Sequence, residues 1–99
     1  MLWAATQQPL PAEPASPKVT MVTASKQGYD IIAGFYTSRA SAARMTYVLK
    51  NQGCDAYVVE KNNGYYVSMG SAGTRTAAEA LMKHIKSWYD GDVVIKKID

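Results

Sequence analysis

Hydrophobic and polar positions follow two different periods along this chain from residue 29 onward. In four stretches, β-branched and aromatic residues cluster or alternate with polar ones, as they do in strands. In two others, apolar residues recur every three to four positions, as on one face of a helix. The predicted strands cover residues 29–36, 56–60, 65–69 and 92–98, and the predicted helices run from about residue 38 to 53 and from about residue 74 to 89.

Each predicted helix has a start signal and an apolar face. Ser38 and Thr74 stand where an N-cap hydroxyl would accept a hydrogen bond from the first turn. Gly53 follows the first helix, at a position where a left-handed residue commonly ends one. The pair Asn63-Gly64 between the middle strands is typical of a two-residue hairpin. The buried helix faces are predicted to consist of Ala42, Met45 and Leu49 in the first helix and Ala78, Leu81 and Ile85 in the second.

The two halves of this pattern repeat at a distance of 36 residues. The run Tyr29–Gly34 falls on Tyr65–Gly70, and Ser38 falls on Thr74. The apolar helix positions and the last strand of each half match at the same offset. A half of this size cannot bury its own apolar face, so we expect the two halves to share one core.

The order βαββαβ predicts an α+β domain of the RNP or ferredoxin-like kind. Right-handed crossovers place both helices on one face of a four-stranded antiparallel sheet. The first and third predicted strands, 29–36 and 65–69, lie in its centre. The other face is left open unless another segment covers it.

Residues 1–28 are predicted to be a Pro- and Ala-rich tail or linker, and residues 29–99 the folded domain. All four prolines lie between Pro9 and Pro17, which favours an extended, solvated segment. The short run 18–23 alternates in the way of a strand, so an additional edge strand there remains an alternative.

Composition excludes several classes of protein. The chain has 99 residues, 47% of them hydrophobic and 19% charged, which suits one small folded domain and excludes a wholly disordered chain. A single cysteine excludes a disulfide framework, and no apolar run is long enough to span a bilayer. The formal net charge of +3 is weak evidence for a polyanionic partner.

The sequence predicts no enzyme, no metal site and no cofactor. His84, the only histidine, falls on the polar flank of the second helix. Cys54 has no partner thiol and is expected to be a half-buried residue at the entry to a strand. The acidic residues are scattered without spacing that would suggest acid/base chemistry or metal ligation.

The open sheet face is the predicted binding site. Strand alternation directs Ile31, Ala33, Tyr36, Val67 and Met69 toward the helices. The outward side chains on the central strands are then Ile32, Phe35, Tyr66 and Ser68, of which the first three form an apolar and aromatic patch. An exposed patch of this kind commonly marks a contact site. The alternative is that the tail or a dimer partner covers it.

These residues resemble a SPOR domain. Tyr29-x-Ile31-Ile32-Ala33-Gly34-Phe35-Tyr36, with Ser38-Arg39-x-x-Ala42-x-x-Met45 and Gly53, is similar to the first half of that family. Val67-x-Met69-Gly70 with Thr74-Arg75-x-x-Ala78-x-x-Leu81 is similar to the second half. The resemblance implies a non-catalytic module that binds peptidoglycan glycan strands stripped of stem peptides, which accumulate at division septa. It also implies a bacterial periplasmic or cell-envelope location. The family often has a polar residue at the position of Ile32 and a small one at that of Phe35.

Two other functions remain open at this point. RNA-recognition domains share this topology and place aromatic residues on the same two strands, although the strand from Tyr65 to Gly70 lacks their basic and aromatic pattern. The apolar outward face would also suit dimerisation or interaction with another envelope protein.

Overall fold

The computed structural model of the protein describes residues 19–98. Residues 1–18, which hold the Pro-rich part of the predicted tail, and residue 99 lie outside the described residues. The elements, in chain order, are β1 (Met21–Val22), β2 (Tyr29–Tyr36), α2 (Arg39–Asn51), β3 (Tyr57–Lys61), β4 (Gly64–Ala72), α3 (Arg75–Lys86) and β5 (Val94–Lys97). From β2 onward the predicted βαββαβ order is confirmed.

The two helices begin and end largely where their capping residues predict. The hydroxyl of Ser38 accepts a hydrogen bond from the Ser41 amide, and the hydroxyl of Thr74 accepts one from Ala77. Gly53 has a φ of 93°, the left-handed conformation that ends α2 at little cost for a residue without Cβ. The helix α3 is shorter than expected, because it ends at Lys86 rather than near residue 89.

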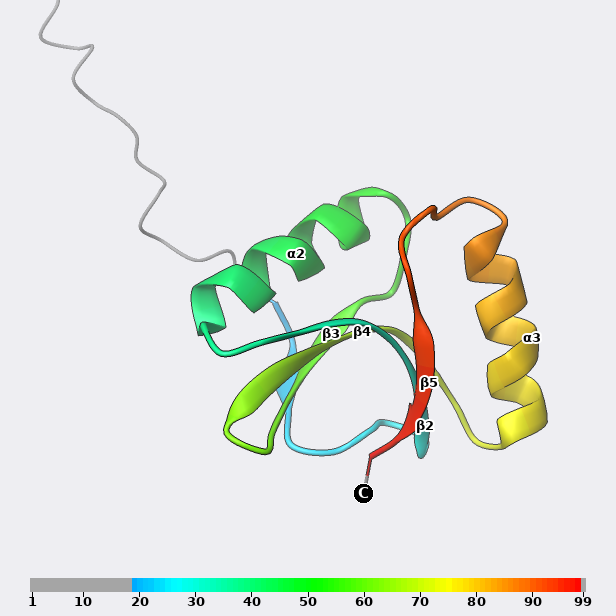
Figure 1. The fold of residues 1–99 in the computed structure, drawn as a ribbon, viewed down its shortest axis with the longest axis horizontal. Coiled ribbons are helices and arrows are strands. Elements are labelled where there is room, and N and C mark those ends of the chain that lie inside the picture. The colour runs from blue at the N-terminus through cyan, green and yellow to red at the C-terminus, as the bar shows by residue number, and fades with distance from the viewer. Residues whose placement is uncertain (1–18, 99) are drawn as a thin grey trace, which may run out of the picture.

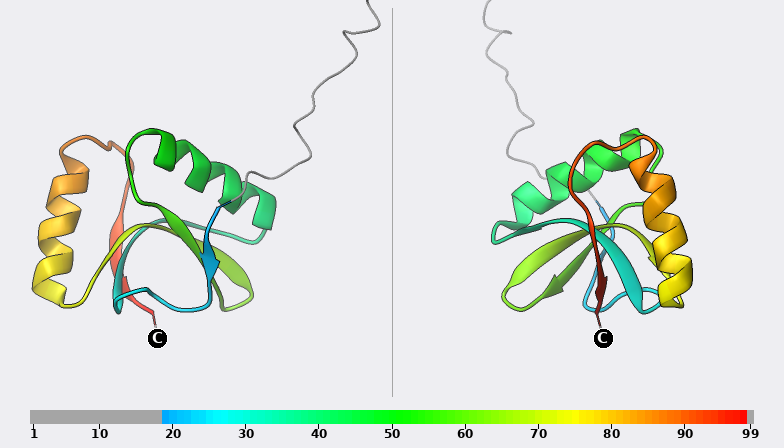
Figure 2. Two further views of the ribbon diagram at one scale, coloured as in Figure 1. Left: turned by 180° about the vertical axis from the view of Figure 1, so that it is seen from behind. Right: turned by 45° about the vertical axis from the view of Figure 1, so that its right-hand side comes forward.

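The sheet has five strands in the order β1-β3-β4-β2-β5 (Figure 1). The central pair, β2 and β4, is confirmed, and β2–β4, β2–β5 and β3–β4 are antiparallel. The prediction of a four-stranded antiparallel sheet is wrong in one respect. Met21 and Val22 pair in parallel with Val58 and Val59, so the sheet is mixed and the edge of β3 is covered by the additional strand. Figure 2 shows β1 beside β3 from behind.

The main core lies between the sheet and the two helices. Both helices pack on β2 and β4, and in Figure 1 they lie above and to the right of the strands. Ala42 and Ala78, one from each half of the repeat, are fully buried, and Leu49 and Ile85 are nearly so. Met45 and Leu81 are partly buried against the same core. The predicted helix faces are therefore confirmed.

The hairpin between β3 and β4 turns one residue earlier than predicted. Asn62 and Asn63, with φ of 58° and 61°, are the two left-handed residues of the turn. Gly64 instead begins β4 opposite Lys61 and is buried. Asparagine tolerates positive φ better than most residues, so this pair can form the turn without a glycine.

Candidate functional site

The four predicted binding residues lie on the sheet face away from the helices. Ile32 is paired with Ser68 across β2 and β4, and Phe35 is paired with Tyr66. On the opposite face, Ile31, Val67 and Met69 belong to the helix-covered core, as we expected. The predicted alternation of the two central strands is confirmed.

That outward face is closed over much of its length. Ile32 is 6% exposed and Ser68 is fully buried, so the expectation that both lie open to a ligand is wrong. Ile32 packs in a second apolar cluster, and the Ser68 hydroxyl turns back to donate to the carbonyl of Gly70 in its own strand. The other buried members of this cluster are Tyr57, Val59 and Ile98, with Val22 and Tyr66 partly buried against them.

The connection 23–28 between β1 and β2 holds one end of this face closed. The Ser25 hydroxyl donates to Asp30 Oδ1 at 2.9 Å and lies 3.0 Å from the Ser71 hydroxyl. It also accepts a hydrogen bond from the Gly28 amide at 2.8 Å. Backbone hydrogen bonds join Ser25 to Ile98 and Ile98 to Gly28, which brings the C-terminal Ile98 into the same closure. In Figure 1 this connection, in cyan, passes along the lower side of the sheet.

A buried tyrosine and a buried aspartate lie at the centre of the closed end. Tyr57 Oη donates to Asp30 Oδ1 at 2.5 Å and accepts from the Lys26 amide at 3.1 Å. The Lys26 ammonium lies 4.5 Å from the centre of the Tyr57 ring. Burial, and then the hydrogen bond to Asp30, raise the pKa of Tyr57. The sequence alone does not predict this network, because Asp30 stands in it as one of several scattered acidic residues without an evident role.

The other end of the face remains open and presents two aromatic rings. Phe35 is 46% exposed, and its ring centre lies 4.6 Å from that of Tyr66 at an interplanar angle of 54°. We call this pair the aromatic shelf. The Phe35 ring lies directly on Gly64, where an added Cβ would come within 2.1 Å of the ring. Gly64 therefore sets the position of the shelf.

Polar groups border the aromatic shelf on two sides. The Asn62 amide donates to Tyr66 Oη at 3.2 Å. The Lys96 ammonium lies 5.4 Å from the centre of the Tyr66 ring. Polar donors beside exposed aromatic faces can bind a ligand that has both an apolar face and oxygen acceptors.

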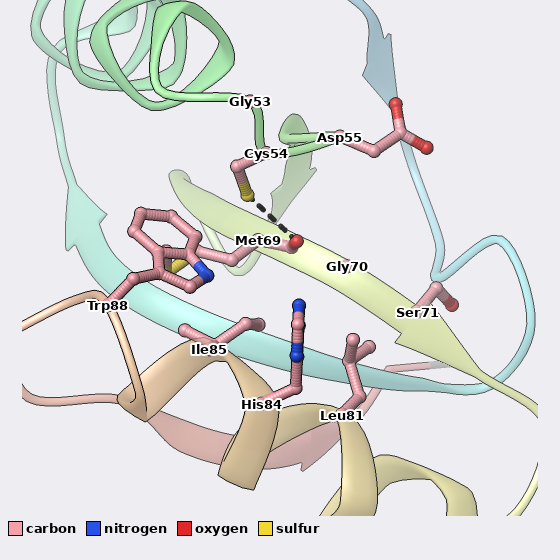
Figure 3. Close-up of a pocket in the computed structure, with 10 residues that line it drawn as sticks. All are labelled: Gly53, Cys54, Asp55, Met69, Gly70, Ser71, Leu81, His84, Ile85 and Trp88. Atoms are coloured by element: carbon pink, nitrogen blue, oxygen red, sulfur yellow. Dashed lines mark hydrogen bonds between the residues drawn. The ribbon is translucent and has the colours of Figure 1, made fainter.

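A separate pocket lies on the helix-covered side of the sheet and brings together the two residues that looked inert in the sequence. Cys54, in the loop between α2 and β3, and His84, on α3, both line it (Figure 3). The Cys54 thiol donates to the Met69 carbonyl at 3.0 Å. Burial and the nearby Asp55 charge raise the pKa of Cys54 to about 11, so the thiol is protonated and unreactive at neutral pH. Cys54 is more deeply buried than expected, with 9% exposure.

Within residues 19–98, no group of three or more His, Cys, Asp and Glu side chains could hold a metal ion. The helices of that same stretch are each too short or too polar to cross a membrane.

Comparison with known proteins gives one match. No curated protein and no solved structure is significantly similar to the chain. The family model described as SPOR domain matches residues 25–96, from the Ser25 network to β5. The match covers most of the chain and both copies of the repeat, so this chain belongs to the SPOR domain family, a family of binding modules known for peptidoglycan binding and associated with the bacterial cell envelope.

Proposed function

We propose that this domain binds peptidoglycan glycan strands from which the stem peptides have been removed, and that the strand lies across the aromatic shelf. The observation that carries the proposal is the pair of neighbouring rings at the open end of a sheet face that is otherwise closed, in which Phe35 is 46% exposed and Tyr66 is partly buried. Exposed aromatic rings stack on the apolar faces of sugar rings. Tyr66 packs against the apolar cluster that contains Ile32, so Ile32 supports the shelf rather than contacting the ligand, and the buried Ser68 is not a ligand contact in this proposal.

The polar border suits a stripped strand in particular. Amide cleavage between sugar and stem peptide leaves a carboxylate on the glycan, and it removes the bulky peptide from the sugar. The Lys96 ammonium beside the Tyr66 ring would pair with such a carboxylate. The hydroxyl of Tyr66 and the amide of Asn62 supply neutral hydrogen-bonding groups for sugar oxygens.

The proposed activity is binding without catalysis. The protonated Cys54 thiol on the far side of the sheet is not a nucleophile at neutral pH. The domain would recruit an envelope protein to the wall at the division septum, in the bacterial periplasm. The Pro-rich part of the predicted linker, before residue 18, would connect the domain to its attachment, whereas residues 21–28 belong to the folded domain as β1 and the connection to β2.

Co-sedimentation with purified sacculi tests the proposal. The wild-type chain should pellet with sacculi, and more of it should pellet after amidase has removed the stem peptides. Phe35→Ala and Tyr66→Ala should each reduce the bound fraction several-fold, by analogy with buried aromatic contacts that are worth roughly 1 to 2 kcal/mol. Tyr47→Ala is the matched control, because Tyr47 is equally exposed on α2. No pelleting with either preparation would overturn the proposal.

Nucleic-acid binding and dimerisation, the two other functions, predict different results with the same protein samples. Salt-sensitive binding to single-stranded RNA, abolished by Tyr66→Ala, would favour a nucleic-acid module over a wall-binding one. A mass that rises with protein concentration and falls after Phe35→Ala would favour dimerisation through the shelf.

A further inference from the structure

The helix-side pocket forms where two strands of the sheet part. The ladder between β3 and β4 ends at the pair Tyr57–Ser68, whereas β4 continues to Ala72. The chain before β3 turns away there toward the end of α2, and α3 closes the opposite side (Figure 3). The resulting pocket has a volume of about 260 Å³. Drug-sized ligands occupy pockets of roughly 300 to 1,000 Å³, so this one suits a single small ring.

The pocket has an apolar floor and two aromatic walls. Met69 and Ile85, both almost fully buried, form the floor. His84, in the last turn of α3, and Trp88, two residues after the helix ends and 38% exposed, form the walls. In Figure 3 the indole nitrogen of Trp88 and the imidazole of His84 face the space between them. The opening thus combines a partly exposed indole with hydrogen-bonding ring nitrogens above an apolar base.

The charge at the rim limits what can enter. Asp55 lies at the rim, and its carboxylate contributes to the raised pKa of the Cys54 thiol, so a negative potential reaches the pocket. An anionic ligand is therefore disfavoured. A neutral ligand with an acceptor oxygen and a small apolar group is complementary to this set of groups.

We propose that this pocket binds one N-acetylated amino sugar, as a second site on the side of the sheet opposite the aromatic shelf. The sugar ring stacks on the Trp88 indole, and the acetamido carbonyl accepts a hydrogen bond from His84 or from the indole N–H. The acetyl methyl group lies on Met69 and Ile85. The neutral acetamide satisfies the ring donors without bringing a negative charge toward Asp55.

The placement of the two sites has a consequence for the intact wall. Because the pocket and the aromatic shelf lie on opposite faces, one domain can hold two glycan segments at once. Two weak sites on one domain raise the affinity for a dense polymer well above that of either alone. The pocket proposal rests on its own residues and holds whether or not the shelf binds glycan.

Titration with free N-acetylglucosamine tests the pocket. The full chain carries two tryptophans, so Trp3→Phe leaves Trp88 as the only indole. N-acetylglucosamine should change its fluorescence with a Kd of about 1 mM, the range of a ligand that buries a single ring. Glucose, which lacks the acetamido group, and acetate, which is an anion, should bind at least about tenfold more weakly. The amide resonances of Gly53 and Gly70, which also line the pocket, should shift in the same titration.

Substitution of His84 separates a specific site from general stacking. In the Trp3→Phe background, His84→Ala should weaken N-acetylglucosamine binding about tenfold, since it removes one ring donor and one wall. Tyr47→Ala is the control and should leave the titration unchanged, because this residue lies on α2 and does not line the pocket. The proposal would be overturned if neither the Trp88 fluorescence nor the glycine resonances changed on addition of N-acetylglucosamine. It would also be overturned if glucose bound as tightly as N-acetylglucosamine, or if His84→Ala bound N-acetylglucosamine as tightly as the parent protein.

Sacculus pelleting of the same samples keeps the two proposals apart. N-acetylglucosamine binding without any pelleting would support the pocket and overturn the proposed wall binding. Pelleting without N-acetylglucosamine binding would support the shelf and overturn the pocket.

Discussion

The two faces of the sheet are both apolar, but different parts of the chain cover them. The face with Ile31, Val67 and Met69 is covered by two amphipathic helices that match at a 36-residue offset. The face with Ile32 and Tyr57 is covered at one end by the short connection 23–28 and by Ile98, and its other end is the partly exposed aromatic shelf. The first face is core apart from the helix-side pocket, whereas the second is half core and half surface.

This difference explains why one end of the second face stays accessible. Helices bury most of the length of a face, because their apolar residues recur over several turns. A six-residue connection can bury only one end and needs side-chain hydrogen bonds to stay in place, here those of Ser25 and Asp30. The other end leaves Phe35 46% exposed beside the partly buried Tyr66, so the proposed binding surface lies where the covering segment stops.

The largest effect is expected in the helix-covered core. Leu49→Ala should lower the free energy of unfolding by roughly 2 to 5 kcal/mol, since it leaves a cavity beside β4 in a fully packed site. A loss of that size is comparable with the whole stability of a domain this small. Val48→Ala, at the adjacent and 49% exposed position on α2, is the control and should cost less than about 0.5 kcal/mol. Urea denaturation followed by circular dichroism measures both, and equal losses would contradict the packing described.

The next effect concerns the closed end of the other face. Ser25→Ala should cost roughly 1 to 3 kcal/mol, because it removes the hydroxyl shared by Asp30, Ser71 and the Gly28 amide. Hydrogen exchange at residues 25–28 should accelerate more than exchange in α2 or α3. The exposed Thr76→Ala on α3 serves as the control. Unchanged exchange in the connection would show that Ser25 does not hold it.

Alkaline pH provides a smaller, chemically distinct test of the helix-covered face. The pKa of Cys54 is raised from 9.0 to about 11, so the native state favours the protonated thiol. Below pH 9 both the folded and the unfolded thiol are protonated, and the contribution is fully present. As pH rises from about 9 to about 11 the unfolded chain ionises first, and stability falls by on the order of 2 kcal/mol.

Cys54→Ala isolates this step. Between pH 9 and 11 the unfolding free energy of the wild type should fall relative to that of the variant. The pKa of Tyr57 is also raised, but Tyr57 titrates in both proteins, so its contribution cancels in the difference. Native Cys54 should also resist a thiol reagent at pH 8. A pH-independent difference, or rapid labelling of the folded protein, would contradict the burial of the thiol.

Periodicity and capping predicted the helix-covered face because these signals are local. The N-caps Ser38 and Thr74, the apolar helix positions and the central strand pair are all as expected from short stretches of sequence. The closed end of the other face depends on contacts such as Tyr57 with Asp30, which are 27 residues apart, and Ser25 with Ser71, which are 46 apart. No short-range pattern marks such pairs. The predicted site was therefore right about which face Ile32 and Ser68 occupy and wrong about their exposure.

A substitution at the open end of the second face should have the smallest effect on stability but a clear effect on binding. Gly64→Ala places a Cβ within 2.1 Å of the Phe35 ring, which must move off Tyr66. Because Phe35 is 46% exposed, its ring can swing toward solvent, and the cost in stability should stay below about 1 kcal/mol. If the aromatic shelf binds glycan, sacculus pelleting should fall several-fold although neither aromatic residue has been changed.

A double-mutant cycle decides whether the glycine acts through the ring. In a Phe35→Ala background, Gly64→Ala should change neither stability nor pelleting, because there is no ring left to displace. Equal losses of pelleting from Gly64→Ala with and without Phe35 would mean that the glycan contacts the hairpin backbone instead of the shelf. Coupling between the two positions would show that the open end of this face works as one surface, set by the absence of a side chain at residue 64.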